Sequence, residues 1–439
     1  MNDKRQKPLS TEPYKGVRDF YPEDMYVRKY LFDVMRTVVE RYGYVEYDAS
    51  VLEPTELYRA KTGDEIVNEQ TYSFTDRGGR DVTLRPEMTP SVARMVAARA
   101  RDLTFPLRWY SIPNIFRYER PQRGRLREHW QLNADIFGEA GSGADIEIIS
   151  IARDIMQTFG ATDADFTIRI NHRALLNAIF SDYLGISNKQ ADALAKLIDR
   201  KAKLPHEAFK NQLTDIVGDK ADTVLDCCET QTFDTLLARL PEQFNDMESV
   251  AELHNIFSTF SQEGATNVVL DPSLVRGFDY YTGVVFEVFD TNPGNNRSLF
   301  GGGRYDRLTE IFGTEPVSAV GFGMGDVTIR DFLQTRNLLP EYHSTADLYL
   351  CTTDSSLIGE AHRLAHTLRT KGLKVELNLS DKRVGDQIRI ANKKAIPFVV
   401  CVGPTELETK QYKVKNLATS EEITVREEEI HEAIQVPKG

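Results

Sequence analysis

The chain has 439 residues and a formal net charge of −12, from 54 lysine and arginine residues against 66 aspartate and glutamate residues. This length predicts two to four domains, because one domain usually takes about 100–200 residues. The acidic balance argues against a protein that coats nucleic acid indiscriminately, so any such contact must come from local basic patches. No run of about 18 apolar residues is present, which argues against a transmembrane helix.

The cysteine pattern and the N-terminal stretch indicate in which cellular compartment the protein is found. The stretch MNDKRQKPLSTEPYKG has no apolar segment of the kind found in secretory signals. Cys227 and Cys228 are adjacent, Cys351 and Cys401 lie far away, and no C-x-x-C motif or disulfide framework results. We therefore expect a protein of the reducing cytoplasm, with no membrane contact.

Residues 1–171 mix helical and strand patterns. Apolar residues recur at helical spacing from Glu23 to Tyr42, and Gly43 ends this predicted helix. Further helices are predicted over 91–100, with Pro90 near the start, and over 144–159. The predicted strands are Tyr44–Leu52, Arg80–Arg85, Trp109–Phe116, Trp130–Phe137 and Asp165–Ile170. We expect Val82–Leu84 and the two tryptophan-containing strands to be neighbours in one antiparallel sheet.

The rest of the chain predicts three more parts and a linker. Over 172–262 strand patterns disappear, and sequences such as ADALAKLIDRKAKL predict an inserted helical domain. Strands resume over 263–336, which we interpret as the second part of the first domain. Residues 337–345 are a predicted linker. Residues 346–439 alternate as β-α-β-α-β, which predicts a small α/β domain with some parallel strand pairing.

An unusual group of six arginines lies between positions 108 and 127, in a stretch that reads strand, tight loop, strand. A guanidinium group matches the geometry of phosphate oxygens, so a polyphosphate or a nucleic acid is the natural partner of this hairpin. The alternative is a basic hairpin that faces solvent. The arginines are Arg108, Arg117, Arg120, Arg123, Arg125 and Arg127, and Glu119 is the only acid among them.

Two other patterns are better explained by the structure of the chain than by a phosphate-binding or metal-binding site. The run Gly301–Gly303 lacks both G-x-x-x-x-G-K-[ST] and G-x-G-x-x-G, so close backbone packing in a sheet is the favoured interpretation. His362 and His366 stand four residues apart, but Arg-Leu-Ala lies between them and no third ligand is apparent. We therefore predict no metal bound directly by side chains.

Three motifs resemble those of a known enzyme family. FRYERPQRGR (116–125) resembles motif 2 of the class II aminoacyl-tRNA synthetases. LVRGFDYYTG (274–283) and FGGGRYD (300–306) resemble the two signature peptides of histidyl-tRNA synthetases. The segments KGVRDFYPED and LRPEMTP, the helical insertion and the C-terminal α/β domain also follow the order of that family. The resemblance covers essentially the whole chain.

The resemblance implies a fold, a reaction and partners. The fold would be α+β, with a six-stranded antiparallel catalytic sheet, a helical insertion and a C-terminal anticodon-binding α/β domain. L-Histidine would react with ATP to give histidyl-adenylate and pyrophosphate, and the histidyl group would then pass to tRNA(His). Mg²⁺ would bridge the ATP phosphates. The protein would be a homodimer.

The resemblance also implies residues that bind ATP. Arg117 would hold the α-phosphate, Glu119 the adenine side and Arg125 the pyrophosphate portion. Arg276 would lie against the α-phosphate, where other class II enzymes typically use a metal. Arg276 and Arg117 are thus the expected catalytic residues, because transition-state stabilisation by such donors dominates this kind of transfer.

The residues implied for histidine binding are Glu87, Thr89, Gln131, Asp135, Tyr280 and Tyr281. Glu87 would pair with the α-ammonium group, with the hydroxyl of Thr89 and the amide of Gln131 nearby. Asp135 and Tyr281 would take the imidazole nitrogens, while Tyr280 lines the pocket. A site that bonds both ring nitrogens rejects isosteres lacking them, because its own polar groups would be left unpaired.

Three positions depart from the family pattern. Asp135 stands where many members carry glutamate. Ser50 replaces the motif 1 proline near the dimer interface, with Pro54 four residues later. In motif 3, Thr328 stands where the class carries its ATP-binding arginine, and Arg330 two residues on would be rotated by about 200° on a helix. The arginine hairpin would then carry more of the triphosphate than in relatives.

An alternative function is that of a non-catalytic, histidyl-synthetase-like regulatory subunit of ATP phosphoribosyltransferase. Such a paralogue binds no tRNA and typically lacks the C-terminal domain. That domain is present here, and Glu87, Arg117 and Arg276 are all in place, so the sequence favours the enzyme. The peptide LVRGFDYY argues against a more distant class II enzyme, such as a threonyl or prolyl synthetase.

Overall fold

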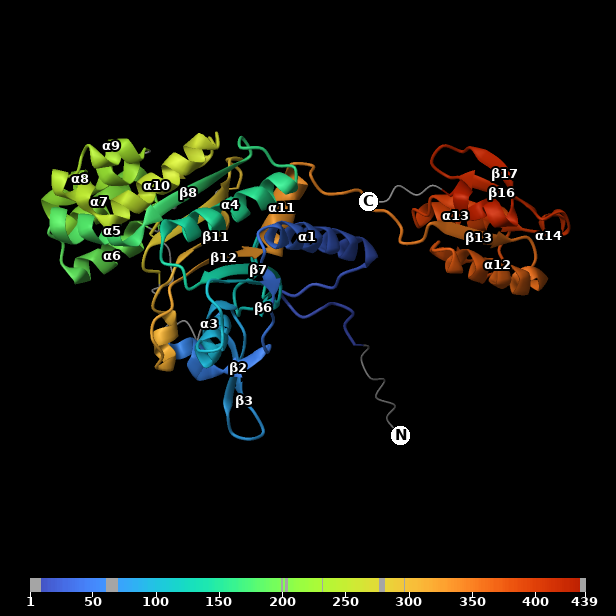
Figure 1. Cartoon of the computed structure of the whole chain (residues 1–439), viewed down its shortest axis with the longest axis horizontal. Coiled ribbons are helices and arrows are strands. Elements are labelled where there is room, and N and C mark those ends of the chain that lie inside the picture. Colours follow the sequence, from blue (N-terminus) through green and yellow to red (C-terminus); the bar gives the residue numbers. More distant parts are fainter. Residues whose placement is uncertain are drawn as a thin grey trace, which may run out of the picture. The chain divides into compact units, whose positions relative to one another are not determined.

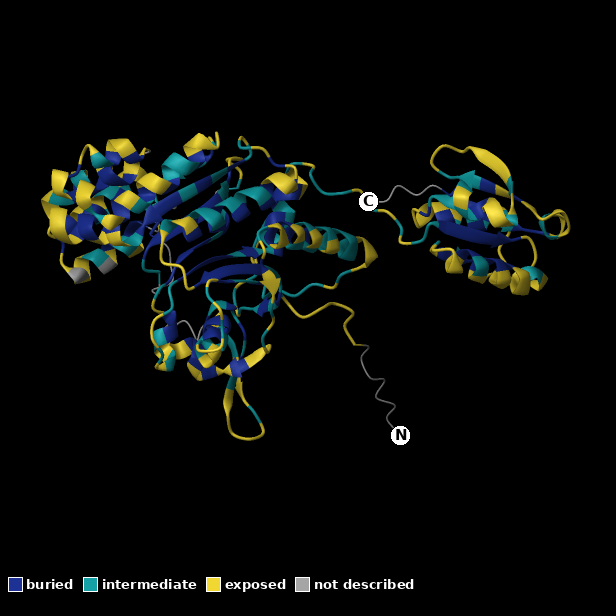
Figure 2. Cartoon of the chain, in the orientation of Figure 1, coloured by how far each residue is buried: buried dark blue, intermediate teal, exposed yellow. Residues whose placement is uncertain are grey.

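A computed structural model describes residues 9–60, 70–198, 200–201, 204–230, 232–275, 281–295 and 297–434. The chain divides into two units, one formed by Met1–Tyr21 and Arg28–Leu339 and the other by Pro22–Val27 and Pro340–Gly439 (Figure 1). Each unit has its own sheet and its own buried core (Figure 2).

The first unit combines long helices with short strands. Its helices are α1 (Pro22–Arg41, from Arg28 on in this unit), α3 (Thr89–Arg99), α4 (Ser142–Thr158), α5 (Arg173–Ala178), α6 (Asn188–Ile198), α7 (His206–Val217), α8 (Ala221–Glu229), α9 (Phe233–Leu237), α10 (Glu248–Gln262) and α11 (Asp326–Thr335). Its strands are β1 (Val45–Glu46), β2 (Leu52–Pro54), β3 (Tyr72–Thr75), β4 (Asp81–Leu84), β5 (Leu107–Ser111), β6 (Asn114–Phe116), β7 (Glu128–Phe137), β8 (Phe166–His172), β9 (Val268–Leu270), β10 (Val284–Asp290), β11 (Ser298–Arg304) and β12 (Ala319–Gly325).

A nine-stranded sheet forms the centre of this unit. Its order is β1-β5-β7-β12-β11-β10-β8-β9, and β6 pairs with β7. The six strands from β5 to β8 in this order pair antiparallel throughout. The edge pairs β1–β5 and β8–β9 are parallel. The predicted α+β fold with a six-stranded antiparallel sheet is therefore confirmed, with further strands added at its edges.

One predicted strand neighbour is wrong. The strand β4, which contains Val82–Leu84, pairs with β2 and β3 in a separate three-stranded sheet rather than with the tryptophan-containing strands. The reason is that β5 already has β1 on one edge and β7 on the other, so neither edge is left for β4. Local alternation identified the strand but carried no information about its partner.

The predicted strand Tyr44–Leu52 is likewise interrupted. It forms β1 and the start of β2, with Tyr47–Val51 outside both strands. The carboxylate of Asp48 accepts from the backbone N–H of Ala49 at 2.8 Å, and Arg85 Nη1 donates to the Ala49 carbonyl at 2.7 Å. The residues that make these bonds do not belong to either strand. They separate β1 from β2, and the two strands belong to different sheets.

Helices α4 and α11 pack on the nine-stranded sheet (Figure 1). Apolar residues at helical spacing form the buried face of α4, whereas most residues of its other face are partly buried (Figure 2). The C-terminal end of α1 is tied to the same layer, because the hydroxyl of Tyr42 donates to Asp154 at 2.7 Å. In the described part of the chain, no helix has the length and apolarity needed to cross a membrane.

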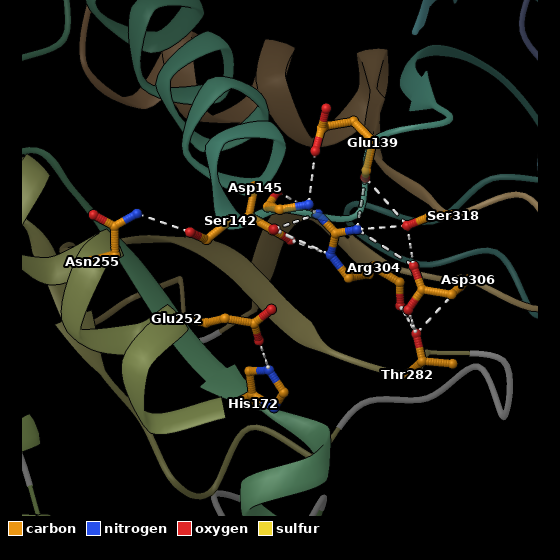
Figure 3. Close-up of polar contacts among 11 residues, drawn as sticks. Glu139, Ser142, Asp145, His172, Glu252, Asn255, Thr282, Arg304, Asp306 and Ser318 are labelled. Atoms are coloured by element: carbon orange, nitrogen blue, oxygen red, sulfur yellow. Dashed lines mark hydrogen bonds and ion pairs between the residues drawn. The ribbon is translucent and has the colours of Figure 1, made fainter. Parts of the chain in front are cut away.

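The helices α5 to α10 lie between β8 and β9, in the range where the sequence predicts a helical insertion. A one-turn π-helix (Ile179–Tyr183) and two short 3₁₀ helices (Gly218–Lys220 and Glu242–Asp246) complete them. Two polar contacts join α10 to the sheet layer. His172 Nε2 lies 2.7 Å from Glu252 Oε2, and the amide of Asn255 donates to the Ser142 hydroxyl at 2.8 Å (Figure 3).

The glycine run in β11 allows neighbouring backbones to approach closely. A Cβ added at Gly302 would lie 2.0 Å from the carbonyl oxygen of Gly321, and one at Gly301 would lie 2.5 Å from that of Phe286. No side chain fits at those distances. The interpretation of this run as close backbone packing is therefore confirmed.

The second unit contains β13 (Leu348–Thr352), α12 (Ile358–Thr370), β14 (Val375–Leu377), α13 (Val384–Lys393), β15 (Phe398–Val402), α14 (Pro404–Thr409), β16 (Gln411–Asn416), β17 (Glu422–Arg426) and α15 (Ile430–Ala433). Its sheet order is β14-β13-β15-β16-β17. The strands β14, β13 and β15 pair in parallel, and the remaining pairs are antiparallel. The predicted β-α-β-α-β alternation with parallel pairing is confirmed.

Candidate active site

A cavity of about 1920 Å³ opens above the antiparallel sheet of the first unit. Every described residue of the predicted site lines it, namely Glu87, Thr89, Arg117, Glu119, Arg125, Gln131, Asp135 and Tyr281. These residues come from the segment between β4 and α3, the start of α3, the arginine hairpin, β7 and the segment before β10. The other two predicted residues, Arg276 and Tyr280, lie outside the described residues.

The segment that carries Glu87 is fixed by a buried arginine. Arg85 is 3% exposed; its Nε donates to the carbonyl of Asn114 at 2.9 Å and its Nη1 to that of Ala49 at 2.7 Å. The chain then enters α3, whose first residue is Thr89. Glu87 is buried at this turn and lines the cavity. A carboxylate held at a buried wall suits a small cationic group such as an ammonium.

Arg117, the residue after β6, lies at the same wall. Its Nε donates to the carbonyl of Pro86 at 2.8 Å, directly beside Glu87. Its backbone N–H donates to the carbonyl of Arg127 at 2.9 Å, which closes the base of the hairpin. The guanidinium is thus oriented by one bond to a neutral oxygen, and its charge is available to an anion in the cavity.

Asp135 lies near the C-terminal end of β7 and lines the cavity. It is 4% exposed, and the hydroxyl of Tyr305 donates to its Oδ1 at 2.5 Å. Burial raises the pKa of Asp135 to about 7, although the bond from Tyr305 acts to lower it. The carboxyl group therefore titrates near neutral pH, where it can accept a hydrogen bond from an imidazole N–H.

The opposite strand leaves room for these polar side chains. A Cβ added at Gly321 would lie 2.0 Å from Asp135 Oδ1, and one at Gly323 would lie 1.7 Å from Gln131 Nε2. Gln131, Asn133 and Asp135 alternate along β7 on the cavity face, as the period of two in a strand requires. The depth of the cavity therefore depends on two glycines of β12.

Sequence reasoning missed two residues of this cavity. Tyr305 lies within the peptide FGGGRYD and Asn133 between two predicted residues, but neither received a role. Alternation along β7 from Gln131 and Asp135 is a signal that could have found Asn133. The Tyr305 contact joins β7 to the segment after β11, and this pairing depends on strand order, which local patterns do not contain.

His129, next to the hairpin, also lines the cavity. Burial and, to a smaller extent, the positive charges of Arg117 and Arg18 together lower its pKa to about 3. The imidazole is therefore neutral at physiological pH. His129 therefore adds no positive charge to this wall, whereas Arg117, Arg123 and Arg125 do.

The hairpin arginines fall into groups with different partners. Arg108 forms an ion pair with Glu147 at 2.7 Å, away from the hairpin tip. Arg123 pairs with Asp331 at 3.0 Å. Arg127 lies 4.3 Å from the ring centroid of Tyr118. These three guanidinium groups therefore have partners within the protein.

Arg125 has a looser contact. Its Nη1 lies 3.5 Å from Glu119 Oε2, and the two side chains are 54% and 19% exposed. The hairpin tip between them is a tight turn, in which Gln122 and Arg125 exchange two backbone hydrogen bonds at 2.9 and 3.0 Å. Gly124 takes a positive φ of 76° at this turn, which glycine adopts without strain. Arg125 is thus free to exchange Glu119 for a phosphate.

The motif 3 helix presents a threonine to this cavity. The hydroxyl of Thr328 donates to the Leu299 carbonyl at 2.6 Å, so it is used within the protein. Of the described residues of α11, Val327, Thr328 and Asp331 line the cavity and Arg330 does not. This agrees with the expectation that Arg330 is no direct substitute for an arginine at 328.

A buried polar cluster supports the strand end that carries Tyr305 (Figure 3). Arg304 Nη2 lies 2.5 Å from Asp145 Oδ2, and its Nη1 donates to the Ser318 hydroxyl at 2.8 Å. Asp306 accepts from Ser318 and from Thr282. The cluster fixes the end of β11 against α4 and also holds Thr282, just after the segment 276–280.

The side chains present suit a metal that arrives with a nucleotide. No group of three or more histidine, cysteine, aspartate or glutamate residues that could hold a metal ion occurs in the described part of the chain. Mg²⁺ usually keeps several waters and is bound by one or two carboxylates together with substrate phosphates. Glu119, beside the arginine hairpin, is a carboxylate that could share such an ion.

An antiparallel sheet that carries an arginine hairpin, a glycine-lined cavity and a glycine-rich third motif defines the catalytic core of a class II aminoacyl-tRNA synthetase. A family model described as histidyl-tRNA synthetase matches residues 16–327, and one described as an anticodon binding domain matches residues 347–436. The chain therefore belongs to the histidyl-tRNA synthetase family.

Individual relatives agree with this assignment. The chain is 43% identical over 426 residues to a histidine–tRNA ligase of Leptospira biflexa, with 96% of each chain covered. It is 37% identical to a histidine–tRNA ligase of Thermoplasma volcanium, covering 94% of this chain and 96% of that one. The crystal structure of histidyl-tRNA synthetase from Nostoc sp. PCC 7120 superposes with a TM-score of 0.83 at 25% identity, covering 97% and 99%. The resemblance found in the sequence is confirmed.

Proposed function

We propose that this chain activates L-histidine with ATP and transfers the histidyl group to tRNA(His). The observation that carries the proposal is the buried Asp135–Tyr305 pair that lines a cavity whose wall holds Glu87 and Arg117. One end of this cavity is suited to an imidazole and an ammonium group, and the other to phosphates. Membership in the histidyl-tRNA synthetase family supports the same reaction.

In the activation step, a carboxylate oxygen of histidine attacks the α-phosphorus of ATP and the bond to the pyrophosphate oxygen breaks. The protein contributes positioning and charge stabilisation more than covalent chemistry. Arg117 would hold the α-phosphate, Glu119 the adenine side and Arg125 the departing pyrophosphate. Arg276 would add a second guanidinium at the α-phosphate. Mg²⁺ bound to the phosphates would supply further charge neutralisation.

Recognition of histidine would use the other half of the cavity. Glu87 would pair with the α-ammonium group, with Thr89 and Gln131 nearby. Asp135 would accept from one imidazole nitrogen. The other nitrogen would bond Tyr281, and Tyr280 would complete the pocket. In this chain Tyr305 would hold the shorter aspartate in place, as its bond to Asp135 indicates.

Exchange of labelled pyrophosphate into ATP tests the proposal. We expect the purified protein to catalyse exchange that depends on added histidine. The regulatory subunit of ATP phosphoribosyltransferase, the alternative function, would give no exchange. The match to an anticodon binding domain at 347–436 supports the enzyme over this alternative. Absence of exchange with intact protein would refute the activation step.

The pKa of Asp135 predicts how histidine binding depends on pH. Because burial raises this pKa to about 7, the carboxyl group is protonated below pH 7 and ionises as the pH rises through it. Only the ionised form accepts freely from the imidazole, so the dissociation constant of histidine should fall, by up to about tenfold per pH unit below the pKa, and then level off. Calorimetric titration at several pH values measures this profile.

The imidazole of histidine itself titrates near pH 6.5 and also contributes to this pH profile. Two variants separate its contribution from that of Asp135. Asp135→Asn should remove the contribution of the carboxyl group and leave only that of histidine. Tyr305→Phe removes a bond that lowers the pKa, so the profile should move to higher pH. Identical profiles for the wild type and Asp135→Asn would contradict the role of this carboxyl group.

The C-terminal unit is proposed to bind the anticodon. We propose a catalytic core at 1–171 and 263–336, an insertion at 172–262, a linker at 337–345 and an anticodon-binding domain at 346–439. Deletion of residues 345–439 should therefore reduce aminoacylation far more than pyrophosphate exchange, because the activation site lies wholly in the first unit. Equal losses in both assays would contradict this division.

We further propose that the protein is a cytoplasmic homodimer. Support comes from exposed apolar residues near Ser50, where motif 1 lies: Val45, Val51 and Leu52 are 58%, 37% and 44% exposed. Contiguous exposed apolar patches commonly mark an interface, and these residues are candidates for such a patch. Light scattering should give twice the chain mass of 49.8 kDa, and a monomer at micromolar concentration would contradict the proposal.

A further inference from the structure

Arg297 contacts the tip of the arginine hairpin. It lies in the loop between β10 and β11, and its Nη1 donates to the carbonyl of Arg123 at 3.0 Å. Its Nη2 donates to the side-chain oxygen of Gln122 at 3.1 Å. Both acceptors are uncharged, so neither neutralises the guanidinium. A guanidinium has five N–H donors, and these two bonds leave others available.

The chain just after Arg297 contacts the position where motif 3 lacks its arginine. The hydroxyl of Thr328 donates to the carbonyl of Leu299, two residues after Arg297, at 2.6 Å. A Cβ added at Gly124, in the hairpin tip, would lie 3.6 Å from Thr328 Cγ2. The hairpin tip, the start of β11 and residue 328 therefore meet, and Arg297, Gly124 and Thr328 all line the same cavity.

The neighbouring cation at the tip is already paired. Arg123 forms its ion pair with Asp331, with Nε and Nη2 at 3.0 to 3.1 Å from the carboxylate. The bonds of Arg297 to uncharged oxygens of the hairpin tip instead leave its charge uncompensated, at the lining of the cavity. A threonine at 328 is too short and uncharged to bind a phosphate there as an arginine would.

We propose that Arg297 binds the terminal phosphates of ATP and the departing pyrophosphate, and so replaces the arginine missing from position 328. The proposal rests on the proposed function, because it assigns a residue to the ATP that this function requires. The two bonds of Arg297 to the hairpin also have a role in this proposal. They orient the planar guanidinium toward the cavity, and the loop and hairpin tip would hold the triphosphate between them.

The test compares ligands that do and do not carry the terminal phosphates. In Arg297→Gln, we expect the dissociation constant of ATP and the KM of pyrophosphate in the reverse reaction to rise about 10–100-fold, as expected for loss of one charged hydrogen-bond donor. The affinities for AMP and for histidine should change less than about twofold. Unchanged AMP binding also shows that the variant is folded.

Two further variants sharpen the result. Arg297→Lys keeps the charge and should retain most of the pyrophosphate affinity; a loss equal to that of Arg297→Gln would overturn the proposal. Arg307→Gln is the matched control, because Arg307 is exposed and pairs with Glu310 at 3.0 Å. This control should behave as the wild type.

The outcomes separate this proposal from the proposed function. A wild type without histidine-dependent exchange refutes the function itself. A wild type that exchanges, while Arg297→Gln keeps its ATP and pyrophosphate constants, refutes only the role of Arg297. Equal weakening of ATP and AMP would also refute it, because the residue would then only shape the hairpin.

Discussion

The variant Arg304→Ala is expected to lose about 3–5 kcal/mol of unfolding free energy, because it leaves a buried carboxylate without its partner. The side chains of Arg304 and Asp145 are 4% and 1% exposed, and their closest atoms lie 2.5 Å apart. The same guanidinium also bonds the hydroxyl of Ser318 and the carbonyls of Glu139 and Gly141 (Figure 3). Its removal breaks all of these contacts at once.

Tryptophan fluorescence in a urea titration reports the unfolding of the first structural unit, because both tryptophans, Trp109 and Trp130, lie there. Arg307→Ala is the control. Its ion pair with Glu310 is 73% and 35% exposed, so it should cost less than about 1 kcal/mol. Similar losses for both variants would contradict the importance given to the buried pair.

A double replacement tests how much of this loss comes from the unpaired buried charge. Arg304→Met with Asp145→Leu removes both charges and should recover part of the loss, because no uncompensated charge then remains buried. If the double variant is less stable than Arg304→Ala, the neutral contacts of the arginine outweigh its charge.

The second large effect is expected at Arg117. Arg117→Ala should lower the rate of histidine-dependent pyrophosphate exchange about 10²–10³-fold, as removal of a single transition-state donor commonly does. The wall position of Arg117, oriented by its bond to the Pro86 carbonyl at 2.8 Å, supports a role at the reacting phosphate. Steady-state exchange kinetics at saturating ATP and histidine measure the effect on kcat.

The kinetic pattern distinguishes this role from simple binding. A residue that stabilises the transition state lowers kcat when it is removed, whereas one that binds substrate uniformly raises KM alone. Arg117→Lys, which keeps the charge but loses the planar fork, should fall between the wild type and alanine. A raised KM for ATP with unchanged kcat would contradict the catalytic role of Arg117.

Features with a local signal could be predicted from the sequence. The helix α1 follows its apolar spacing to Gly43, and the β-α-β-α-β pattern of the second unit specifies its parallel strands. Close packing of Gly301–Gly303 followed from the absence of a phosphate-loop pattern. In each case the decisive residues lie within a few positions of one another.

Features that depend on long-range pairing were missed. The strand β4 was recognised, but its sheet was not, because alternation is the same whichever partner a strand has. Tyr305 and Asp135 are 170 residues apart, and Arg297 and Arg123 are 174 apart. Through family motifs, the sequence therefore predicted a set of polar residues that all line one cavity, but not the residues that orient them or lie opposite them.

Two contacts, those of Asp331 and Arg297, change the interpretation of the arginine hairpin. The sequence suggested that the hairpin carries more of the triphosphate than in relatives, because Thr328 replaces the arginine of motif 3. In the structure Arg123 is neutralised by Asp331, and the hairpin tip instead receives a second guanidinium from Arg297. The proposed ATP site is therefore shared between the hairpin and the loop that precedes β11.

Aminoacylation of tRNA(His) tests the central claim most directly. Purified full-length protein, incubated with ATP, Mg²⁺, tRNA(His) and each of several labelled amino acids, should esterify the tRNA with histidine alone. Charging that requires histidine and ATP is the result we predict. Protein that binds histidine but forms no histidyl-tRNA under these conditions would contradict the account.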